Sequence, residues 1–337
     1  MKLFATLVFA LLCQYSLFVI SAVGQQAPPV VQPPEITLHS SANLVLVDVF
    51  ALNAKNGLPD KTLTRDDFQV FDNGHPVSIK TFDSGAQLAT RPVALWLVVQ
   101  CNMQGWQAQG SGLFAGRISL FNPALKYLQK HDTVAVAHWG DNGDAQLDLL
   151  PTSNVEEVAP ALEQVLASMH SPKDHSRPGE LALQKTLQLI VDATRSLAPE
   201  PVPVVVFPYG DWSGTPRSEA DHFIDELLEA SAIAYGLKDR RSPHMWWLAG
   251  EQKEVAHYIA NETGGQYLAV TPETYGAGLG EILQQLHFRY ELGFTPEALD
   301  GKRHELRVIL ADAAKNPHKG VRLRHRPAYV PMRHQNE

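Results

Sequence analysis

The sequence predicts a doubly wound α/β domain with a mostly parallel six-stranded sheet, accompanied by a small β module built from the N- and C-terminal segments. Residues 93–99 (VALWLVV) are apolar throughout, which is typical of a strand buried on both faces of a sheet. From there to Phe288, apolar runs alternate with helical patterns, as expected when helices cover both faces of a parallel sheet. Residues 35–90 and 289–330 carry strand and turn patterns only.

The α/β domain is expected over residues 91–288. After its first strand, further strands are expected at 133–139, 145–149, 203–207, 231–237 and 266–270. Helices are expected at 113–129, from 154 onward, and at 180–197, 216–230, 250–263 and 275–288. Asn154 and Glu157 have the spacing of a capping box, which predicts a helix start. The turn 141–144 (DNGD) predicts that the second and third strands form a hairpin.

The two flanking segments supply the expected β module. In the first, strands are expected at 43–52, 68–71 and 77–82, the last two on either side of the turn Asp72-Asn73-Gly74. In the second, strands are expected at 290–295, 304–311 and 321–325. A few strands at each end of the chain cannot each make a core, so we expect residues 35–90 and 289–330 to pair into one module.

The N-terminus has the pattern of a secretory signal. Lys2 precedes an apolar run over residues 3–20, and small residues follow to Gly24, which predicts a signal peptide over residues 1–24 with cleavage after Gly24. Residues 25–34 predict a Pro-rich linker, and residues 331–337 a short tail. The alternative is a retained membrane anchor, because the run approaches the length of a bilayer span. We expect a secreted, periplasmic or cell-envelope protein without a transmembrane segment after cleavage.

Charge and cysteine content limit the classes of partner and of stabilisation. The formal net charge is −8 and there is no long basic run, which argues against nucleic acid or an anionic membrane surface as the main partner. Of the two cysteines, Cys13 lies in the expected signal, so the mature chain would keep Cys101 alone. Export without an internal disulfide means that folding rests on the core.

Short motifs in a fixed order flank the expected α/β domain. Before it stand residues 44–48 (LVLVD), Leu63-Thr64-x-x-Asp67-Phe68 and Phe71-x-x-Gly74. Behind it stand Glu262-Thr263-Gly264-Gly265, Tyr290-x-Leu292-Gly293-Phe294, Asp300-Gly301-Lys302 and Arg326-Pro327-x-Tyr329. By the order and spacing of these motifs, the chain resembles the von Willebrand factor A (vWA)-related proteins described from Acidobacteria, over nearly all of its mature length. The resemblance implies an exported vWA domain with a Rossmann-like sheet, flanked by β segments, in a family without established catalytic activity.

The resemblance also directs attention to a metal site. A vWA domain usually holds a divalent cation through Asp-x-Ser-x-Ser after the first strand, a Thr from a second loop and an Asp after the fourth strand. Here the first motif falls on Gln100-Cys101-Asn102-Met103-Gln104, the second near Glu180, and the third at Tyr209. Neutral amides without a carboxylate do not offset the dehydration of a magnesium ion, so we expect a degenerate site with no metal and no cofactor. Glu180 and Asp211 are the nearby acids that could restore one.

Tryptophans are concentrated after the expected strands. Trp106, Trp212, Trp246 and Trp247 follow parallel strands and Trp139 ends one, so all five should project toward the carboxyl edge of the sheet. One interpretation is that long loops pack their own tryptophans as small cores, and Trp139 fits this best. The other is an aromatic surface for a protein or carbohydrate partner. Its candidate partner-binding residues are Trp106, Gln107, Asp211, Trp212, Trp246 and Trp247.

Thiol catalysis and zinc binding have weaker support in the sequence. Cys101 at a strand end could act as a nucleophile with His138 as base, but a lone cysteine there is usually a small buried hydrophobe, and a Cys-x5-Arg phosphate loop would need arginine where Gln107 stands. No pair among the histidines has a zinc-binding spacing. The C-terminal histidines lie among Lys and Arg and are expected on the solvated surface; they are His318, His325 and His334.

Three functional hypotheses follow. The first is an exported, non-enzymatic interaction or adhesion-type module that binds a protein or glycan partner without a metal, at the tryptophan-bearing edge. The second is a structural or assembly component of the cell envelope whose β module binds and whose α/β domain is a scaffold. The third is a thiol-dependent enzyme using Cys101.

Overall fold

The computed structural model describes residues 44–84, 88, 91–101, 123–140, 145–168, 180–198, 200–208, 217–239, 255–311, 318 and 320–331. These residues all belong to one unit of the chain, Asn43–Glu337. The expected signal peptide and linker lie outside the described residues, and so does the expected tail apart from its first residue. Within the described residues, no helix has both the length and the apolar character needed to cross a membrane.

A six-stranded sheet forms the centre of the α/β domain, with strand order β10-β9-β8-β5-β6-β7. Its strands are β5 (Val93–Cys101), β6 (Thr133–Gly140), β7 (Ala145–Thr152), β8 (Val202–Phe207), β9 (Ile233–Asp239) and β10 (Tyr267–Val270). All neighbouring pairs are parallel except β6 with β7, which are antiparallel. This confirms the predicted fold class and the predicted hairpin pairing. Read from the β7 edge, with the strands numbered along the chain from β5, the order is third, second, first, fourth, fifth, sixth. This is the doubly wound arrangement.

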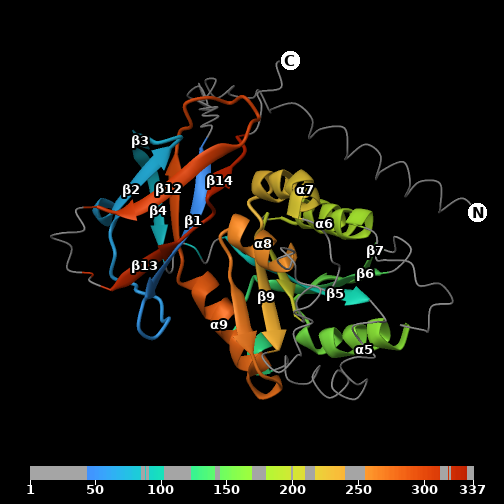
Figure 1. Ribbon diagram of the computed structural model, residues 1–337. Coiled ribbons are helices and arrows are strands. Elements are labelled where there is room, and N and C mark those ends of the chain that lie inside the picture. The colour runs from blue at the N-terminus through green and yellow to red at the C-terminus, as the bar shows by residue number, and fades with distance from the viewer. Residues whose placement is uncertain are drawn as a thin grey trace, which may run out of the picture. The chain divides into compact units, whose positions relative to one another are not determined.

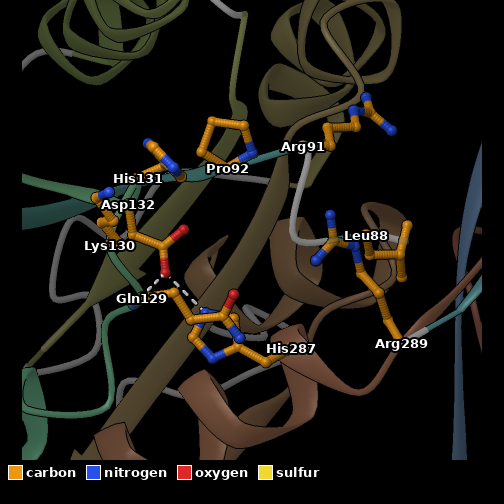
Figure 2. Close-up of a pocket in the computed structure, with 9 residues that line it drawn as sticks. All are labelled: Leu88, Arg91, Pro92, Gln129, Lys130, His131, Asp132, His287 and Arg289. Atoms are coloured by element: carbon orange, nitrogen blue, oxygen red, sulfur yellow. Dashed lines mark hydrogen bonds and ion pairs between the residues drawn. The ribbon is translucent and has the colours of Figure 1, made fainter. Parts of the chain in front are cut away.

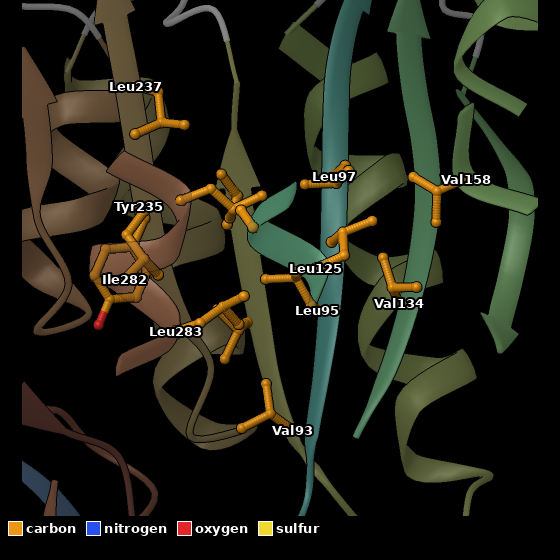
Figure 3. Packing of buried hydrophobic residues seen from close by; sticks show 14 of the residues in the cluster. Val93, Leu95, Leu97, Leu125, Val134, Val158, Tyr235, Leu237, Ile282 and Leu283 are labelled. Atoms are coloured by element: carbon orange, nitrogen blue, oxygen red, sulfur yellow. The ribbon is translucent and has the colours of Figure 1, made fainter. Parts of the chain in front are cut away.

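Alternation along β5 explains why the sheet is buried on both faces. Leu95 and Leu97 pack into one apolar cluster, whereas Trp96 and Val98 pack into the other. Helices α5 (Val158–Ser168) and α9 (Tyr275–His287) contribute to the first cluster, part of which Figure 3 shows. The second cluster takes residues from α6 (Glu180–Arg195), α7 (Arg217–Glu229) and α8 (Val255–Glu262). Figure 1 shows these helices on the two sides of the sheet.

Two helix predictions need adjustment. The helix expected over 113–129 is described only from Pro123, and its helical residues end at Leu125. The helix expected from Asn154 begins with the 3-10 turn η5 (Val155–Glu157), and the α-helix α5 follows it. Asn154 does act as N-cap, accepting a hydrogen bond from the Glu156 N–H at 3.3 Å. Glu157 accepts from the Asn154 side chain at 3.0 Å instead of from its backbone, so the predicted capping box is only half formed.

The predicted β module consists of two four-stranded sheets, each of which contains both early and late strands. One has the order β13-β1-β11-β4 and the other β14-β12-β2-β3. The early strands are β1 (Val45–Asn53), β2 (Phe68–Asp72), β3 (His75–Val77) and β4 (Ile79–Ser84). The late strands are β11 (Tyr290–Phe294), β12 (His304–Leu310), β13 (Val321–Arg324) and β14 (Ala328–Tyr329). The apolar cluster of this module therefore contains residues from both ends of the chain, such as Val47 and Leu292.

One predicted strand of this module is two strands. The turn residues Asn73 and Gly74 have φ values of 47° and 84°, as the Asp-Asn-Gly signal requires for a tight hairpin between β2 and β3. The segment expected as a single strand over 77–82 changes sheet at Ser78, because β3 pairs with β2 whereas β4 pairs with β11. The short strand β14 was not predicted.

Two glycines of the Glu262–Gly265 motif allow close approach of three segments. Gly264 has a φ of +80°, and a Cβ there would lie 2.4 Å from the backbone nitrogen of Arg326. A Cβ at Gly265 would lie 1.7 Å from the carbonyl oxygen of Ala234 in β9. Larger residues would separate α8, β9 and the segment after β13, so the motif has a packing reason.

Candidate functional site

The carboxyl edge of the six-stranded sheet is the first place to look for a site. Strands β5, β6, β8 and β9 run parallel, so their carboxyl ends lie at the same edge. Chain order reverses between β5 and β8, and doubly wound sheets bind ligands in the crevice beyond such a reversal. At this edge the last residues of β5 pair with those of β6, Gln100 with Trp139 and Cys101 with Gly140.

Most residues predicted for this edge lie outside the described part of the chain. For the degenerate metal site, the backbone alone is described at Gln100, near the end of β5, and at Glu180, the first residue of α6. Outside the described residues lie Asn102, Gln104, Tyr209, Trp106, Gln107, Asp211, Trp212, Trp246 and Trp247. The described strands bring together the points from which the tryptophan-bearing loops leave. The degenerate metal site and the aromatic surface stay predictions.

The two described tryptophans are core residues. Trp139 is 1% exposed and packs edge-to-face on Phe207, with ring centroids 5.8 Å apart. It therefore lies on a face of the sheet and does not project beyond its carboxyl edge. Trp96 is also buried, and its Nε1 donates to Thr194 Oγ1 at 3.0 Å.

A histidine–aspartate pair lies near the end of β5. His138 Nδ1 is 2.8 and 2.9 Å from the two carboxylate oxygens of Asp148, across the β6–β7 hairpin. His138 is paired in register with Val99, two residues before Cys101. The imidazole is thus held by a carboxylate through one ring nitrogen, which is how a general base is oriented. Across the described ranges, no group of three or more His, Cys, Asp or Glu side chains could hold a metal ion.

A second candidate site lies at the opposite, amino edge of the sheet. A pocket of about 120 Å³ is lined by residues that precede β5 and β6 and by residues at and after the end of α9 (Figure 2). Its charged or titratable lining residues are Arg91, Lys130, His131, Asp132, His287 and Arg289.

Asp132 organises one wall of this pocket. Its Oδ1 accepts from the Val93 N–H at 2.8 Å, and its Oδ2 accepts from the Gln129 N–H and lies 2.7 Å from His287 Nε2. The pKa of Asp132 is lowered: burial alone would raise it, but the bonds from His287 and the two backbone groups outweigh burial. The carboxylate is therefore charged and fully engaged with donors, which anchors the starts of β5 and β6 to α9.

Behind the pocket, buried charges join the sheet to the β module. Arg289 Nε donates to Asp48 Oδ1 at 2.6 Å, and Arg91 pairs with Glu291. Burial opposes the charge of Asp48, but Arg289 and Arg91 lower its pKa. Burial raises the pKa of Glu291 against the attraction of Arg91. We call Asp48, Arg91, Arg289, Glu291 and Arg326 the junction cluster.

Arg326 extends the junction cluster to the helices. Its Nη1 donates to the Leu228 carbonyl of α7 at 2.9 Å, and its Nη2 donates to the Leu46 carbonyl of β1 at 2.8 Å. Burial lowers the pKa of Arg326 to about 10. Sequence reasoning singled out neither the pocket nor this cluster. The available signal was a charged residue inside an otherwise apolar β segment, at Asp48. Arg326 follows Arg324 and His325 and gave no such signal.

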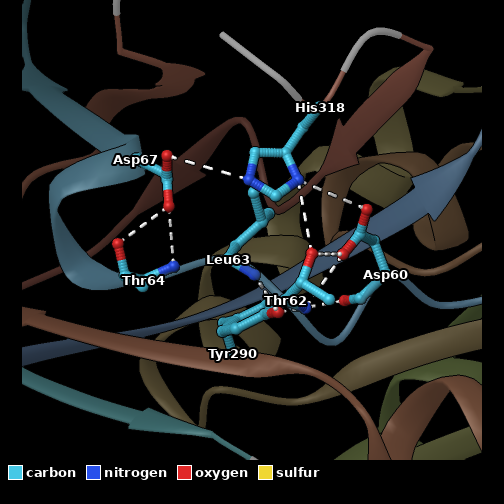
Figure 4. Close-up of polar contacts among 7 residues, drawn as sticks. All are labelled: Asp60, Thr62, Leu63, Thr64, Asp67, Tyr290 and His318. Atoms are coloured by element: carbon cyan, nitrogen blue, oxygen red, sulfur yellow. Dashed lines mark hydrogen bonds and ion pairs between the residues drawn. The ribbon is translucent and has the colours of Figure 1, made fainter.

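Two of the C-terminal histidines are not on the solvated surface as predicted. His318 is half-buried; its Nδ1 lies 3.6 Å from Asp60 Oδ2, and its Nε2 lies 4.0 Å from Asp67 Oδ1 (Figure 4). His325 is also half-buried: its Nε2 is 3.1 Å from the Val308 nitrogen and its Nδ1 2.7 Å from the Arg326 carbonyl oxygen. Both make contacts that fix the C-terminal strands to earlier parts of the module. His334 lies outside the described residues.

Solved structures provide the available likenesses. The chain is similar to a von Willebrand factor type A protein from Catenulispora acidiphila at 11% identity and a TM-score of 0.42, over 87% of this chain and 74% of that one. It is similar to BatB from Bacteroides thetaiotaomicron at 18% identity and a TM-score of 0.37, over 58% and 97% of the two chains. An aerotolerance-related membrane protein from Bacteroides fragilis gives 14% identity and a TM-score of 0.36, over 58% and 98%. No family model and no curated protein sequence matches the chain. The fold assignment rests on this chain's own strand order and register.

Proposed function

We propose that this protein is an exported, non-enzymatic interaction module of vWA type, which binds a protein or glycan partner at the carboxyl edge of its sheet. The observation that carries the proposal is the meeting of four parallel strand ends around the reversal between β5 and β8. The loops that leave these ends contain Trp106, Trp212, Trp246 and Trp247. Tryptophan is enriched at recognition surfaces, because its rigid ring buries a large area at low entropic cost.

The proposed binding is free of metal. Between Gln100 and Gln104 the chain offers amides and no carboxylate, so the usual ligands of a hard divalent cation are missing from the first loop. The resemblance to the vWA-related proteins of Acidobacteria, and export through residues 1–24 to the periplasm, cell envelope or medium, are parts of the same proposal. The sequence motifs and the signal pattern support them.

The decisive experiment is partner capture from the envelope fraction of the source organism by the purified mature protein. The variant Trp106→Ala/Trp212→Ala/Trp247→Ala should lose capture and keep its melting temperature. The matched control is Tyr127→Ala, since Tyr127 is 41% exposed and belongs to the segment that leads into the amino end of β6. A large drop in melting temperature in the triple variant would show that the tryptophans pack as small cores, and unchanged capture would also overturn the proposal.

The absence of a metal requirement is tested on the same protein. Magnesium or calcium titrated to millimolar concentration should leave the melting temperature and the capture yield unchanged. A clear rise in melting temperature would mean that Glu180 or Asp211 restores a site, since a cation that binds only the folded state stabilises it.

One more variant distinguishes this proposal from the alternative, in which the protein is an envelope assembly component that binds through its β module. Leu58, in the connection between β1 and β2, is 57% exposed. If the β module is the binding element, Leu58→Ser should reduce capture while the tryptophan variant retains it.

Thiol chemistry is the second candidate function, favoured by the pairing of His138 with Asp148 near the end of β5. If His138 activates the Cys101 thiol, this thiol should react faster with iodoacetamide in the wild type than in His138→Gln, over a range of pH. Equal rates in the two proteins are expected under the non-enzymatic proposal.

A further inference from the structure

Arg289 has a donor that the described structure does not use. A guanidinium carries five N–H groups. Arg289 Nε donates to Asp48 at 2.6 Å and Nη1 donates to the Leu286 carbonyl at 2.6 Å, whereas Nη2 is buried and has no partner among the described residues. Arg289 is 1% exposed, so bulk water does not satisfy it. A buried charged donor without a partner is costly, and such a group in a native protein indicates a bound water or ion.

The residue that carries the free donor lines the amino-edge pocket. Figure 2 shows the Arg289 guanidinium turned toward the space bounded by Pro92, Asp132 and His287. Arg91 and Lys130 line the same space. The only carboxylate in the described lining is Asp132, and its two oxygens already face three donors. An incoming anion would therefore meet cationic groups and a carboxylate whose oxygens are already engaged by donors.

The charges around the pocket are unbalanced. Among the described residues that line the pocket, Arg91, Lys130 and Arg289 are cationic and Asp132 is the one carboxylate. A water molecule would satisfy Nη2 but leave the excess positive charge. An oxyanion would accept a hydrogen bond from Nη2 and would also balance the positive charge. The hydrogen bonds that a guanidinium donates to an oxyanion are of the strong, charge-assisted kind.

The pocket is large enough for such a ligand. Its volume of about 120 Å³ is several times the roughly 10–15 Å³ that one buried water needs, so a small oxyanion fits.

We propose that the pocket at the amino edge of the sheet binds one small oxyanion, of the phosphate, sulfate or carboxylate kind, through Nη2 of Arg289. Arg91 and Lys130 supply further positive charge, and His131 lies on the same wall as Lys130. Because Arg289 belongs to the connection between the sheet and the β module, the anion satisfies an open donor of that junction. This site is independent of the proposed partner binding at the opposite edge.

The test is calorimetric binding and thermal melting of the mature protein with sodium phosphate, sulfate or acetate, at constant ionic strength in a chloride background. Saturable binding of at least one anion, with a rise in melting temperature, is expected. Preference for phosphate or sulfate identifies a free tetrahedral anion, and preference for acetate identifies a carboxylate such as a peptide would supply. Absence of saturable binding for all three overturns the proposal.

Variants separate the site from general charge effects. Arg289→Lys keeps the charge but removes Nη2, so affinity should fall at least about tenfold, the equivalent of one charge-assisted hydrogen bond. Lys130→Glu changes an exposed rim residue and should weaken binding without affecting the fold. Lys126→Glu is its matched control: this residue is exposed in the same segment but does not line the pocket. Equal affinity in Lys130→Glu and Lys126→Glu would contradict the assignment, even if Arg289→Lys fails to fold.

Discussion

The interior of the six-stranded sheet and its junction with the β module are both buried, but different forces hold them. In β8, Val204, Val205 and Val206 are fully buried and belong to the apolar clusters on the two faces of the sheet. The junction instead buries Asp48 and Arg289 as an ion pair. Apolar packing contributes through the volume it fills, whereas a buried ion pair contributes little net stability yet is costly to break. Substitutions in the sheet should therefore lower the free energy of unfolding when they change side-chain volume, and substitutions in the junction should lower it when they change charge.

The largest expected effect comes from breaking the junction. Asp48→Asn leaves Arg289 without its counter-charge, and should lower the free energy of unfolding by about 3–5 kcal/mol, as for other broken buried pairs. The pKa of Asp48 is lowered from its ordinary value of 3.8, so its contribution is present above that value and is lost as the pH falls through the folded-state pKa. Urea unfolding at neutral and acid pH measures both effects, and the loss in the variant should shrink toward acid pH.

The control for this change is Asp66→Asn, because Asp66 is exposed and the change of charge is the same. Its unfolding free energy should stay within about 0.5 kcal/mol of the wild type. A similar loss in both variants would mean that net charge, and not the junction, is being measured.

In the sheet interior, the loss of stability should depend on the side-chain volume removed. Leu97→Ala removes a fully buried side chain of β5 and should cost about 2–5 kcal/mol, through lost burial and the cavity left behind. Leu150→Ala in the edge strand β7, where the side chain is 62% exposed, should cost less than about 0.5 kcal/mol. The Leu97→Ala loss should not vary between neutral and acid pH. A loss that varied with pH as strongly as that of Asp48→Asn would remove the distinction between the two regions.

A smaller, pH-dependent effect is expected at His325. Its Nε2 lies opposite the Val308 N–H and its Nδ1 opposite the Arg326 carbonyl, a pattern that fits the neutral ring protonated on Nδ1. Burial lowers the pKa of His325 from 6.5, so the folded state prefers the neutral ring. Stability is therefore full above about pH 6.5 and declines as the pH falls toward the lowered pKa.

The measurement is the unfolding free energy of the wild type and of His325→Gln between about pH 5 and pH 7.5. The variant should lose part of the decline, since it removes the titrating group. Parallel curves for the two proteins would show that other groups cause the pH dependence.

The sheet could be predicted from the sequence because its signals are local. Apolar runs at β5 and β8 and the turn at 141–144 each lie within a few residues. The split at Ser78 could not be predicted, since alternation continues on both sides of it while the pairing partner changes. Arg91 and Arg289 stand at the ends of elements, where charged residues are usually solvated. Their pairing with Glu291 and Asp48 depends on segments far away in the chain.

Of the two candidate sites, one could be located from the sequence and the other could not. The position of the carboxyl edge followed from strand order, and Gln100 and Cys101 stand where that order placed them. The amino-edge pocket could not be predicted, because it requires residues before β5, before β6 and after α9 to meet. His318 and His325 were misassigned because a Lys- and Arg-rich neighbourhood in sequence does not indicate which acids, such as Asp60, approach in space.

The pairing of early with late strands in the β module has a consequence for biogenesis. β1 pairs with β11 and β13, and β2 pairs with β12 on the edge that β3 leaves open. These late partners are made only after the whole α/β domain has emerged from the ribosome. Until then, β1 and one edge of the β2–β3 hairpin are unpaired and exposed to proteases and to other chains. A protein built in this way is closed by its last strands, and a short truncation at the C-terminus should leave a nascent chain that cannot complete its first sheet.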